Sequence, residues 1–484
     1  MKKQMSFSTK HLASWVALAI IAAAAAYILG WLLVRFPVEY TFAGILGMLV
    51  IFALLRSPQF AFLALAFALP FERIGSVDIA GSTVRVSQVV LLCLLAYLFF
   101  GVTRRIPNIL PKSYPIAVPL IAYAIIAGFS LLYAPNLTRS VSVLAFILFT
   151  MTASFIVPAF LNTEEKQRTL VRVLLASMTV VTVFGLYQWV GDFIGLPTAL
   201  TGLRELYTKE ILGFPRIQST ALEPLYFANY LLLPLSMTTV LFIRKNTIVS
   251  LPVAFGLAAL GFLNLALTVA RGGYIAMSAS LAVIITWYFL NRQLISWRVI
   301  ATLAGLGIVG IVAVTQLQQF DGLTEKVASH VVNIFAGASY NERAYTIEQA
   351  KDAFWTHPLV GIGPGSFGPY IAPHPFTQPD TGWGIVNNVY LEVLTETGIL
   401  GAFALFSSWI IVIIRSIYAL TYGKGEETRL LLVATLAAFI GIIVQYNTFS
   451  VLFIVHVWFV IGLLIALQNI ALQNAALPKD TQSV

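Results

Sequence analysis

Charged residues are scarce in this sequence. Asp, Glu, Lys and Arg together make up 10% of the 484 residues, whereas hydrophobic residues make up 59%. Soluble domains carry roughly a quarter charged residues, so the composition excludes an ordinary water-soluble enzyme. Apolar runs of about twenty residues recur along the chain, and each is long enough to cross a bilayer as a helix. The sequence therefore predicts an all-α polytopic membrane protein.

Cysteine is almost absent as well. Cys93 is the single cysteine, and it lies inside an apolar run. One cysteine excludes both an intramolecular disulfide and a cysteine metal site. The segments that are predicted below to lie outside the membrane on its outer side contain no aspartate-rich motif. They also contain no group of His, Asp and Glu at metal-ligand spacing. We therefore predict that the protein uses no metal and no cofactor.

About fourteen apolar segments are candidate spans, and about twelve is the lower limit because the third is short. They are 12–34, 40–55, 58–72, 86–103, 114–133, 140–161, 169–191, 222–243, 249–270, 273–290, 297–317, 389–414, 429–447 and 449–470. The residues before the first segment lack a signal-cleavage pattern, so we expect an uncleaved span there.

Basic residues set the orientation of these spans. The formal net charge is +9, and most Lys and Arg residues outside the spans fall in even-numbered connections. The positive-inside rule makes that side cytoplasmic and places both termini on it. The excess of positive charge is thus a topology signal, and we predict no nucleic-acid partner. The loops 192–221 and 318–388 then lie on the extracytoplasmic side.

Three regions follow from this arrangement. Residues 1–317 hold the first eleven spans, with an outer loop at about 192–221, and residues 389–484 hold the last spans and a cytoplasmic tail. Residues 318–388 form a long polar break between them. Loops of that length are usually functional or disordered. The aromatic residues of this one argue against disorder, so we expect a folded lid outside the membrane.

The lid is predicted to contain an amphipathic helix. Asn341 is a plausible N-cap, and His357-Pro358 should end the helix. Its apolar stripe at helical spacing consists of Ala344, Ile347, Ala350, Phe354 and Trp355.

A glycine-rich turn follows the lid helix at Gly361, Gly363 and Gly365. Successive backbone amides in such a turn can cradle an anion. A plain turn is the alternative reading of the same spacing.

Three arginines are predicted at the outer edge of the spans. Arg216 precedes the eighth span, Arg271 lies between two apolar runs with almost no loop, and Arg343 belongs to the lid helix. Ionisable residues at this depth usually line a cavity or pair with a partner, although Arg271 can also snorkel to lipid phosphate. Because the planar fork of arginine binds two oxygens and stays charged, the three together predict a site for a diphosphate on a membrane lipid.

Four motifs on the predicted outer face carry a family resemblance. They read R-x-x-S-T-x-x-E-P-x-x-F-A-x-Y-L at 216–231, A-R-G-G at 270–273, E-R at 342–343 followed by H-P-L-x-G-x-G-x-G-x-F at 357–367, and N-N-x-Y-L-E-x-L-x-E-T-G-x-x-G at 387–401. In this order they resemble the O-antigen ligase and Wzy-type polymerase superfamily of bacterial surface-polysaccharide enzymes.

The resemblance implies a glycosyltransferase of the bacterial inner membrane that moves a glycan from undecaprenyl diphosphate by inverting displacement. The acceptor is a lipid-linked core sugar in ligases, another glycan in polymerases and a protein in some relatives. The active site is implied to be extracytoplasmic. Arg216 and Arg271 resemble the diphosphate-binding arginines of the family, and Arg343 matches the arginine that opens the lid helix.

The fourth motif departs from the family pattern. Where the family usually has a histidine that activates the acceptor hydroxyl, this chain has Asn387, followed by Asn388. An amide does not titrate near neutrality, so asparagine cannot be the base. His374 from the same loop is one candidate, unless it is a plain surface residue. Glu223 or Glu392, with a pKa raised by burial, is another. The remaining alternative is a catalytically silent protein that only binds the carrier.

A transporter or flippase for an anionic lipid or solute is the rival from another class. It would also have many spans and cations at membrane depth. Transporters tend to show paired halves with broken helices near the midplane. We find no such internal symmetry in this sequence, and the outer basic residues accompany one large asymmetric loop. These features favour the glycosyltransferase.

Overall fold

The computed structural model describes residues 47–48, 50–74, 76–79, 82–107, 109–244, 246–291, 338–373, 383–450, 452 and 454–476. The chain divides into two units, residues 1–61 and residues 62–484. The described part of the first unit is helical apart from Ser57. The candidate site lies within the second unit.

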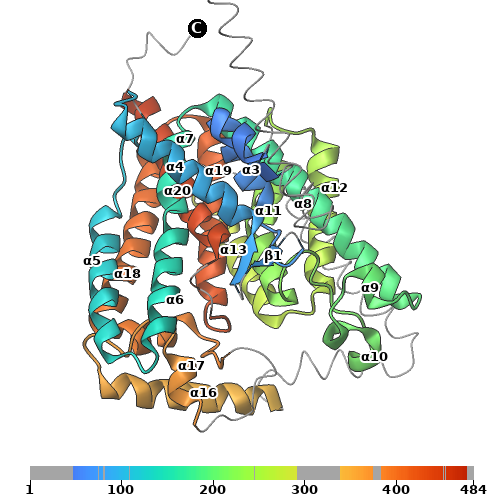
Figure 1. The fold of residues 1–484 in the computed structure, drawn as a ribbon. Coiled ribbons are helices and arrows are strands. Elements are labelled where there is room, and N and C mark those ends of the chain that lie inside the picture. The colour runs from blue at the N-terminus through green and yellow to red at the C-terminus, as the bar shows by residue number, and fades with distance from the viewer. Residues whose placement is uncertain are drawn as a thin grey trace, which may run out of the picture. The chain divides into compact units, whose positions relative to one another are not determined.

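Eight helices of the described chain are long and apolar enough to cross a membrane (Figure 1). They are α4 (Val86–Thr103), α6 (Leu137–Met151) continued by α7 (Ala153–Phe160), α8 (Glu164–Phe193), α11 (Pro224–Ile243), α13 (Arg271–Leu290), α18 (Val389–Tyr422), α19 (Glu426–Gln445) and α20 (Val455–Ala476). Shorter apolar helices are α3 (Pro58–Ala68), α5 (Ala117–Ser130) with η1 (Leu131–Tyr133), and α12 (Leu251–Leu267). The predicted all-α polytopic fold is confirmed.

The predicted spans coincide with these helices wherever both are described. The expected spans 12–34 and 297–317 lie outside the described residues, as does part of 40–55. The total of about fourteen spans therefore stays a prediction.

α11 and α20 form the centre of the bundle. In each, 94% of the most apolar window is buried, against 33% in α13. α11 packs on α12, α13 and α19, whereas α20 packs on α7, α18 and α19. Helices that are apolar around their whole circumference are the ones that bury in this way. Because α11 begins at the candidate site, the centre of the bundle fixes the position of that site.

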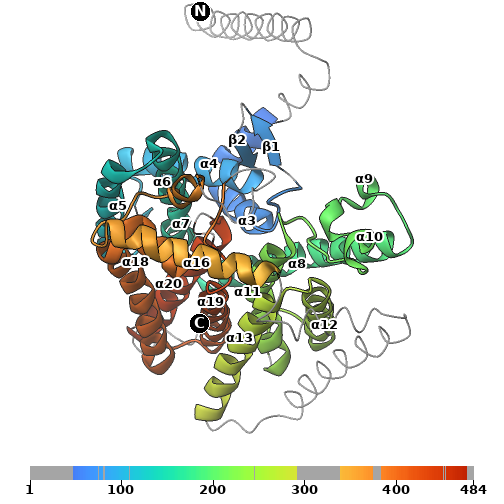
Figure 2. The same ribbon diagram turned by 90° about the horizontal axis from the view of Figure 1, so that it is seen from below.

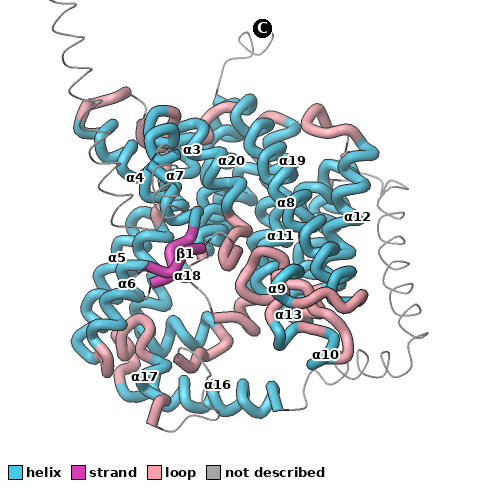
Figure 3. Tube along the Cα trace, turned by 45° about the vertical axis from the view of Figure 1, so that its right-hand side comes forward, coloured by secondary structure: helices cyan, strands magenta, loops and turns pink. Residues whose placement is uncertain are grey.

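The elements that do not span gather at one end of the bundle, which we call the loop end. They are α9 (Thr198–Thr201), η2 (Glu205–Tyr207), α10 (Lys209–Leu212), α16 (Ala338–Thr356) and α17 (Phe367–Ile371). Figures 1 and 3 both place α16 and α17 below the spans and α10 toward the same end. An antiparallel hairpin of β1 (Ser76–Ile79) and β2 (Ser82–Arg85), with Ser76 opposite Arg85, leads into α4.

The predicted lid helix is present as α16, with two corrections. It begins at Ala338, so Asn341 lies inside the helix and is not its N-cap. Ala344 and Trp355 of the predicted stripe are exposed, and Ala353 takes the buried position beside Ala350. Small residues fill this face because α16 lies close against α17 and α18, as seen from below in Figure 2.

The segment that follows α16 pairs with α18 through its backbone. α18 is kinked at Gly398, whose φ of 65° and ψ of −172° lie outside the helical region. Before the kink, Ile362 N donates to Thr395 O at 3.0 Å. After the kink, Ile399 N donates to Pro358 O at 2.9 Å. Residues on both sides of the kink thus supply backbone partners to residues 358–362. We call this pairing of residues 358–362 with residues 395–399 the backbone lock.

Two glycines allow the backbone lock to close. A Cβ on Gly361 would meet the backbone of Glu396, and a Cβ on Gly398 would meet the backbone of Leu359. Both glycines have a positive φ, of 76° and 65° respectively. The combination of φ and ψ at Gly398 is reached essentially by glycine alone. Packing therefore explains one glycine in each of the last two sequence motifs, Gly361 at 357–367 and Gly398 at 387–401.

We expect Gly398→Ala to destabilise the protein by more than the ~1–3 kcal/mol of backbone strain, because the new methyl group also meets Leu359. Thermal unfolding of the purified protein in detergent measures the loss. Gly256→Ala is the matched control, since a Cβ there meets nothing within 4 Å. Equal melting temperatures for the two variants would show that the backbone lock contributes no stability.

Candidate active site

Arg216 is fixed in the loop between α8 and α11. Its backbone N donates to Tyr207 O at 2.9 Å, and its Nε donates to Thr268 O at 3.2 Å. The guanidinium carbon lies 5.7 Å from the centre of the Tyr207 ring. These contacts tie the loop to the end of α12 and hold a half-buried cation at the loop end. Burial lowers the pKa of Arg216, and nearby Arg271 adds to the effect.

Arg271 is the first residue of α13. It lies near Arg216 although it belongs to a different element. The chain turns between α12 and α13 through Val269, whose φ of 47° is left-handed. Gly272 and Gly273 then lie in the first turn of α13. A Cβ on Gly273 would lie 2.6 Å from the Cβ of Ala228, so the glycines let α13 approach α11 closely. The sequence A-R-G-G thereby brings Arg271 next to Arg216.

Arg343 occupies a different element from these two. It lies on α16, whose main packing partners are α18 and α17. The Thr346 hydroxyl, one turn further along α16, donates to the Arg343 carbonyl at 3.0 Å. The structure therefore places two of the three predicted arginines, Arg216 and Arg271, close enough for their charges to interact, and it places the third on the lid helix.

Glu223 lies beside the arginine pair at the N-cap position of α11. Its side chain makes no capping hydrogen bond. Burial raises the pKa of Glu223, while Arg204 and Arg216 oppose the rise. The carboxylate is thus partly desolvated yet close to two cations, which is an environment found at acid–base sites.

Tyr226 connects Glu223 with deeper carboxylates. It lies in the first turn of α11, and its ring packs edge-on against Phe449 with centroids 4.6 Å apart. Electrostatic interactions link Tyr226 to Glu72, Glu223 and Glu392. Two of the predicted base candidates, Glu223 and Glu392, therefore face the same tyrosine from α11 and α18.

Glu396, one turn beyond Glu392 in α18, accounts for the glycine-rich turn. The amides of Gly365 and Phe367 donate to its carboxylate, the latter at 3.3 Å. The group held by these amides is thus a carboxyl group of the protein itself. Arg139 reinforces the turn, because its Nε donates to Gly365 O at 2.8 Å.

Asn388 has a structural task in α18. It is the N-cap residue, and its Oδ1 accepts from Leu391 N at 3.0 Å. Its Nδ2 donates to Asn447 O at 3.3 Å, and its backbone N donates to Ser450 Oγ at 2.8 Å. Asn387 before it has a φ of 57°. Asparagine and histidine both tolerate this left-handed region better than most residues.

Two histidines bear on the candidate site. His374 lies outside the described residues. His456 is buried in α20, where its Nε2 lies 2.6 Å from Asn229 Oδ1 and its Nδ1 lies 3.8 Å from Glu72 Oε1. The proximity of Glu72 and His456 could not be predicted, because the two residues are far apart in the chain.

The part of the chain that the structure describes contains no group of three or more His, Cys, Asp and Glu side chains arranged to hold a metal ion. The site as described therefore consists of arginines, carboxylates and tyrosines.

Residues 256–406 match the family model described as "O-Antigen ligase". The match includes Arg271, Arg343 and Asn387, whereas Arg216 and Glu223 precede it. No curated protein matches the chain. The superfamily indicated by the four motifs is confirmed, and the match supports a multi-pass membrane glycosyltransferase of the O-antigen ligase type.

We expect Asn388→Ala to lower the free energy of unfolding by about 1 kcal/mol, the usual cost of removing an N-cap. Asn388→Asp retains the acceptor and should stay closer to wild type. Melting temperatures of the two variants measure the difference. If both variants melt with the wild type, capping by Asn388 does not matter for stability.

Proposed function

We propose that this protein transfers a glycan from an undecaprenyl-diphosphate carrier to an acceptor at the extracytoplasmic face of the bacterial inner membrane. The observation that carries the proposal is the pair Arg216 and Arg271, held half-buried at the loop end by three different elements. Two fixed guanidinium groups at a span end suit the two phosphates of a lipid carrier, whose tail would lie among the helices.

The arginine pair also suits the chemistry. When an acceptor oxygen attacks the anomeric carbon, the bond from that carbon to the diphosphate oxygen breaks, and its electron pair leaves with undecaprenyl diphosphate. Negative charge grows on the leaving group during this step. Preorganised cations beside it stabilise the transition state more than the ground state. Arg216 and Arg271 supply that stabilisation in the proposed mechanism, which needs no metal.

Glu223 is the base that the geometry favours. It is half-buried beside Arg216, its carboxylate is not used for capping, and burial raises its pKa toward the working range of a base. The proton of the acceptor hydroxyl would pass to this carboxylate. Glu392 lies deeper, at the same tyrosine, and remains the second candidate. His374 stays a prediction from the sequence.

The distribution of charge supports the orientation. Arg168 pairs with Glu427 at 2.7 Å and Arg244 with Glu426 at 3.4 Å, so these basic connections meet at the start of α19. The loop end lies at the other ends of the same helices. By the positive-inside rule the basic end is cytoplasmic, and the arginine pair is then extracytoplasmic. The acceptor, whether a glycan, a lipid-linked glycan or a protein, would reach it from the extracytoplasmic side.

We expect Arg271→Ala and Arg216→Ala to reduce transfer by about 100-fold or more, the typical cost of removing one group that stabilises transition-state charge. Purified protein in nanodiscs would be given undecaprenyl-diphosphate-linked glycan and a panel of acceptors with EDTA present. Release of undecaprenyl diphosphate together with product measures the reaction.

Arg244→Ala is the control for this experiment, because Arg244 pairs with Glu426 at the opposite end. Near-normal transfer by Arg271→Ala would contradict the arginine-clamp mechanism. If the wild type acts on no acceptor and Arg271 is dispensable for carrier binding, a transporter becomes the better account.

We expect Glu223→Gln to lower the transfer rate by about 100-fold or more, the range of a lost general base. Wild-type activity should fall as the pH drops through the pKa of Glu223, which burial holds above the ordinary value of 4.5. The base must be deprotonated to work, so this acidic limb should vanish in Glu223→Gln. A pH–rate profile of both proteins provides the measurement.

Glu392→Gln and Asn387→His complete the set of variants. An active Glu223→Gln beside a silent Glu392→Gln would assign the base to Glu392. A silent wild type beside an active Asn387→His would show that this chain has lost the transfer reaction.

A further inference from the structure

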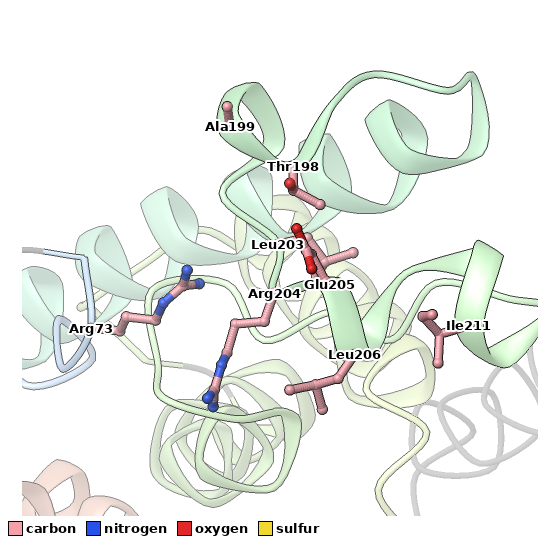
Figure 4. Close-up of a pocket in the computed structure, with 8 residues that line it drawn as sticks. All are labelled: Arg73, Thr198, Ala199, Leu203, Arg204, Glu205, Leu206 and Ile211. Atoms are coloured by element: carbon pink, nitrogen blue, oxygen red, sulfur yellow. The ribbon is translucent and has the colours of Figure 1, made fainter. Parts of the chain in front are cut away.

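A second cationic site lies next to the arginine pair. It is a cavity of about 700 Å³ between the segment that follows α3 and the loop that holds α9, η2 and α10 (Figure 4). Arg73 comes from the first segment and Arg204 from the loop. Neither residue belongs to the diphosphate site described above. The cavity is wide open, so a ligand larger than a single ion can enter it.

Arg73 and Arg204 are held so that their charges lie close together. Arg73 Nη1 donates to Gly202 O at 2.7 Å, and Arg204 Nη1 lies 3.5 Å from Leu222 O. Figure 4 shows both guanidinium groups on one side of the cavity. Burial and the charge of Arg204 both lower the pKa of Arg73. Two fixed like charges repel each other, and an anion placed between them would relieve that repulsion.

No carboxylate among the described residues lies within 4.0 Å of either guanidinium group. Glu223 interacts electrostatically with Arg204 and also with Arg216. Within the described part of the chain, the charge of the two arginines is therefore not neutralised by a direct ion pair. A bound anion would supply the missing partner.

The other walls of the cavity suit a carbohydrate. The Thr198 hydroxyl and the Glu205 carboxylate can exchange hydrogen bonds with sugar hydroxyls. Leu203, Leu206 and Ile211 offer apolar surface to the C–H faces of a sugar ring. A free inorganic anion would use the arginines alone and would leave these walls unused.

We propose that this cavity binds an anionic sugar of the glycan, one that carries a carboxylate or a phosphate. The inference rests on the proposed function, because it takes the ligand to be part of a glycan substrate. Glu223 joins the two sites, since it interacts with Arg204 on the cavity side and Arg216 on the diphosphate side. A glycan attached to the carrier, or one arriving to accept it, would pass from one site to the other.

The first test measures binding to the full chain in phosphatidylcholine nanodiscs by calorimetry. The probes are a glucuronate-containing tetrasaccharide, a phosphorylated mannose trisaccharide and neutral maltotetraose. We expect an anionic probe to bind the wild type and to lose affinity about tenfold in Arg73→Gln or Arg204→Gln, because one charged hydrogen-bonding partner is lost. Glutamine keeps a hydrogen-bond donor for the neighbouring carbonyl. Arg104→Gln, an exposed arginine at the far end of α4, is the control.

Several results would overturn the proposal. They are equal binding of maltotetraose and the anionic probes, unchanged affinity in both glutamine variants, or full displacement of the anionic probes by an equal concentration of inorganic pyrophosphate. The last would show a plain anion site.

The second test asks whether the anionic sugar in the cavity belongs to the donor or to the acceptor. With an anionic glycan on the donor, a raised KM for the donor in Arg204→Gln assigns the cavity to the donor chain. A raised KM for an anionic acceptor assigns it to the acceptor. Carrier binding by undecaprenyl diphosphate without a glycan should survive Arg204→Gln and fail in Arg271→Ala. If the wild type itself does not bind undecaprenyl diphosphate, the proposed function is contradicted. The result of the oligosaccharide-binding test would still stand.

Discussion

The backbone lock between the segment after α16 and the kink of α18 is the constraint on which the lid side of the site depends. It sets where α16 and α17 lie, and it places Glu392 and Glu396 under them. A kink usually costs hydrogen bonds, because it separates donors from acceptors within a helix. Here the freed groups are satisfied by another segment, so the cost is offset and the two segments are held together.

α11 carries the site from the loop end into the interior. Glu223 occupies the position before its first residue, Tyr226 follows in the first turn, and Asn229 lies one turn deeper against His456. Asn229 Nδ2 also donates to Gln445 Oε1 at 2.7 Å. Polar side chains inside a membrane bundle are tolerated when they bond with one another. These polar side chains therefore lead from the loop end into the interior of the bundle, where they bond with one another and are not exposed to lipid.

The spans could be predicted from the sequence, and so could some of the residues of the candidate site. The predicted span 86–103 coincides with α4 because a largely apolar segment of 18 residues leaves little choice of structure. Arg216 and Arg271 were predicted to share a site because both border spans. The partner of the glycine turn was not predictable, since Glu396 reaches it only after α18 docks against the lid segment. The capping role of Asn388 was readable from the apolar run behind it, but we considered the residue for its chemistry alone.

Like charges at the loop end connect the two proposals. Four arginines, Arg73, Arg204, Arg216 and Arg271, follow one another there, and Glu223 interacts with the middle two. Neighbouring guanidinium groups repel each other, and an anionic ligand placed between two of them relieves that repulsion. A diphosphate at one end and an acidic sugar at the other would balance the row, with Glu223 left between them, where the glycosidic bond would be.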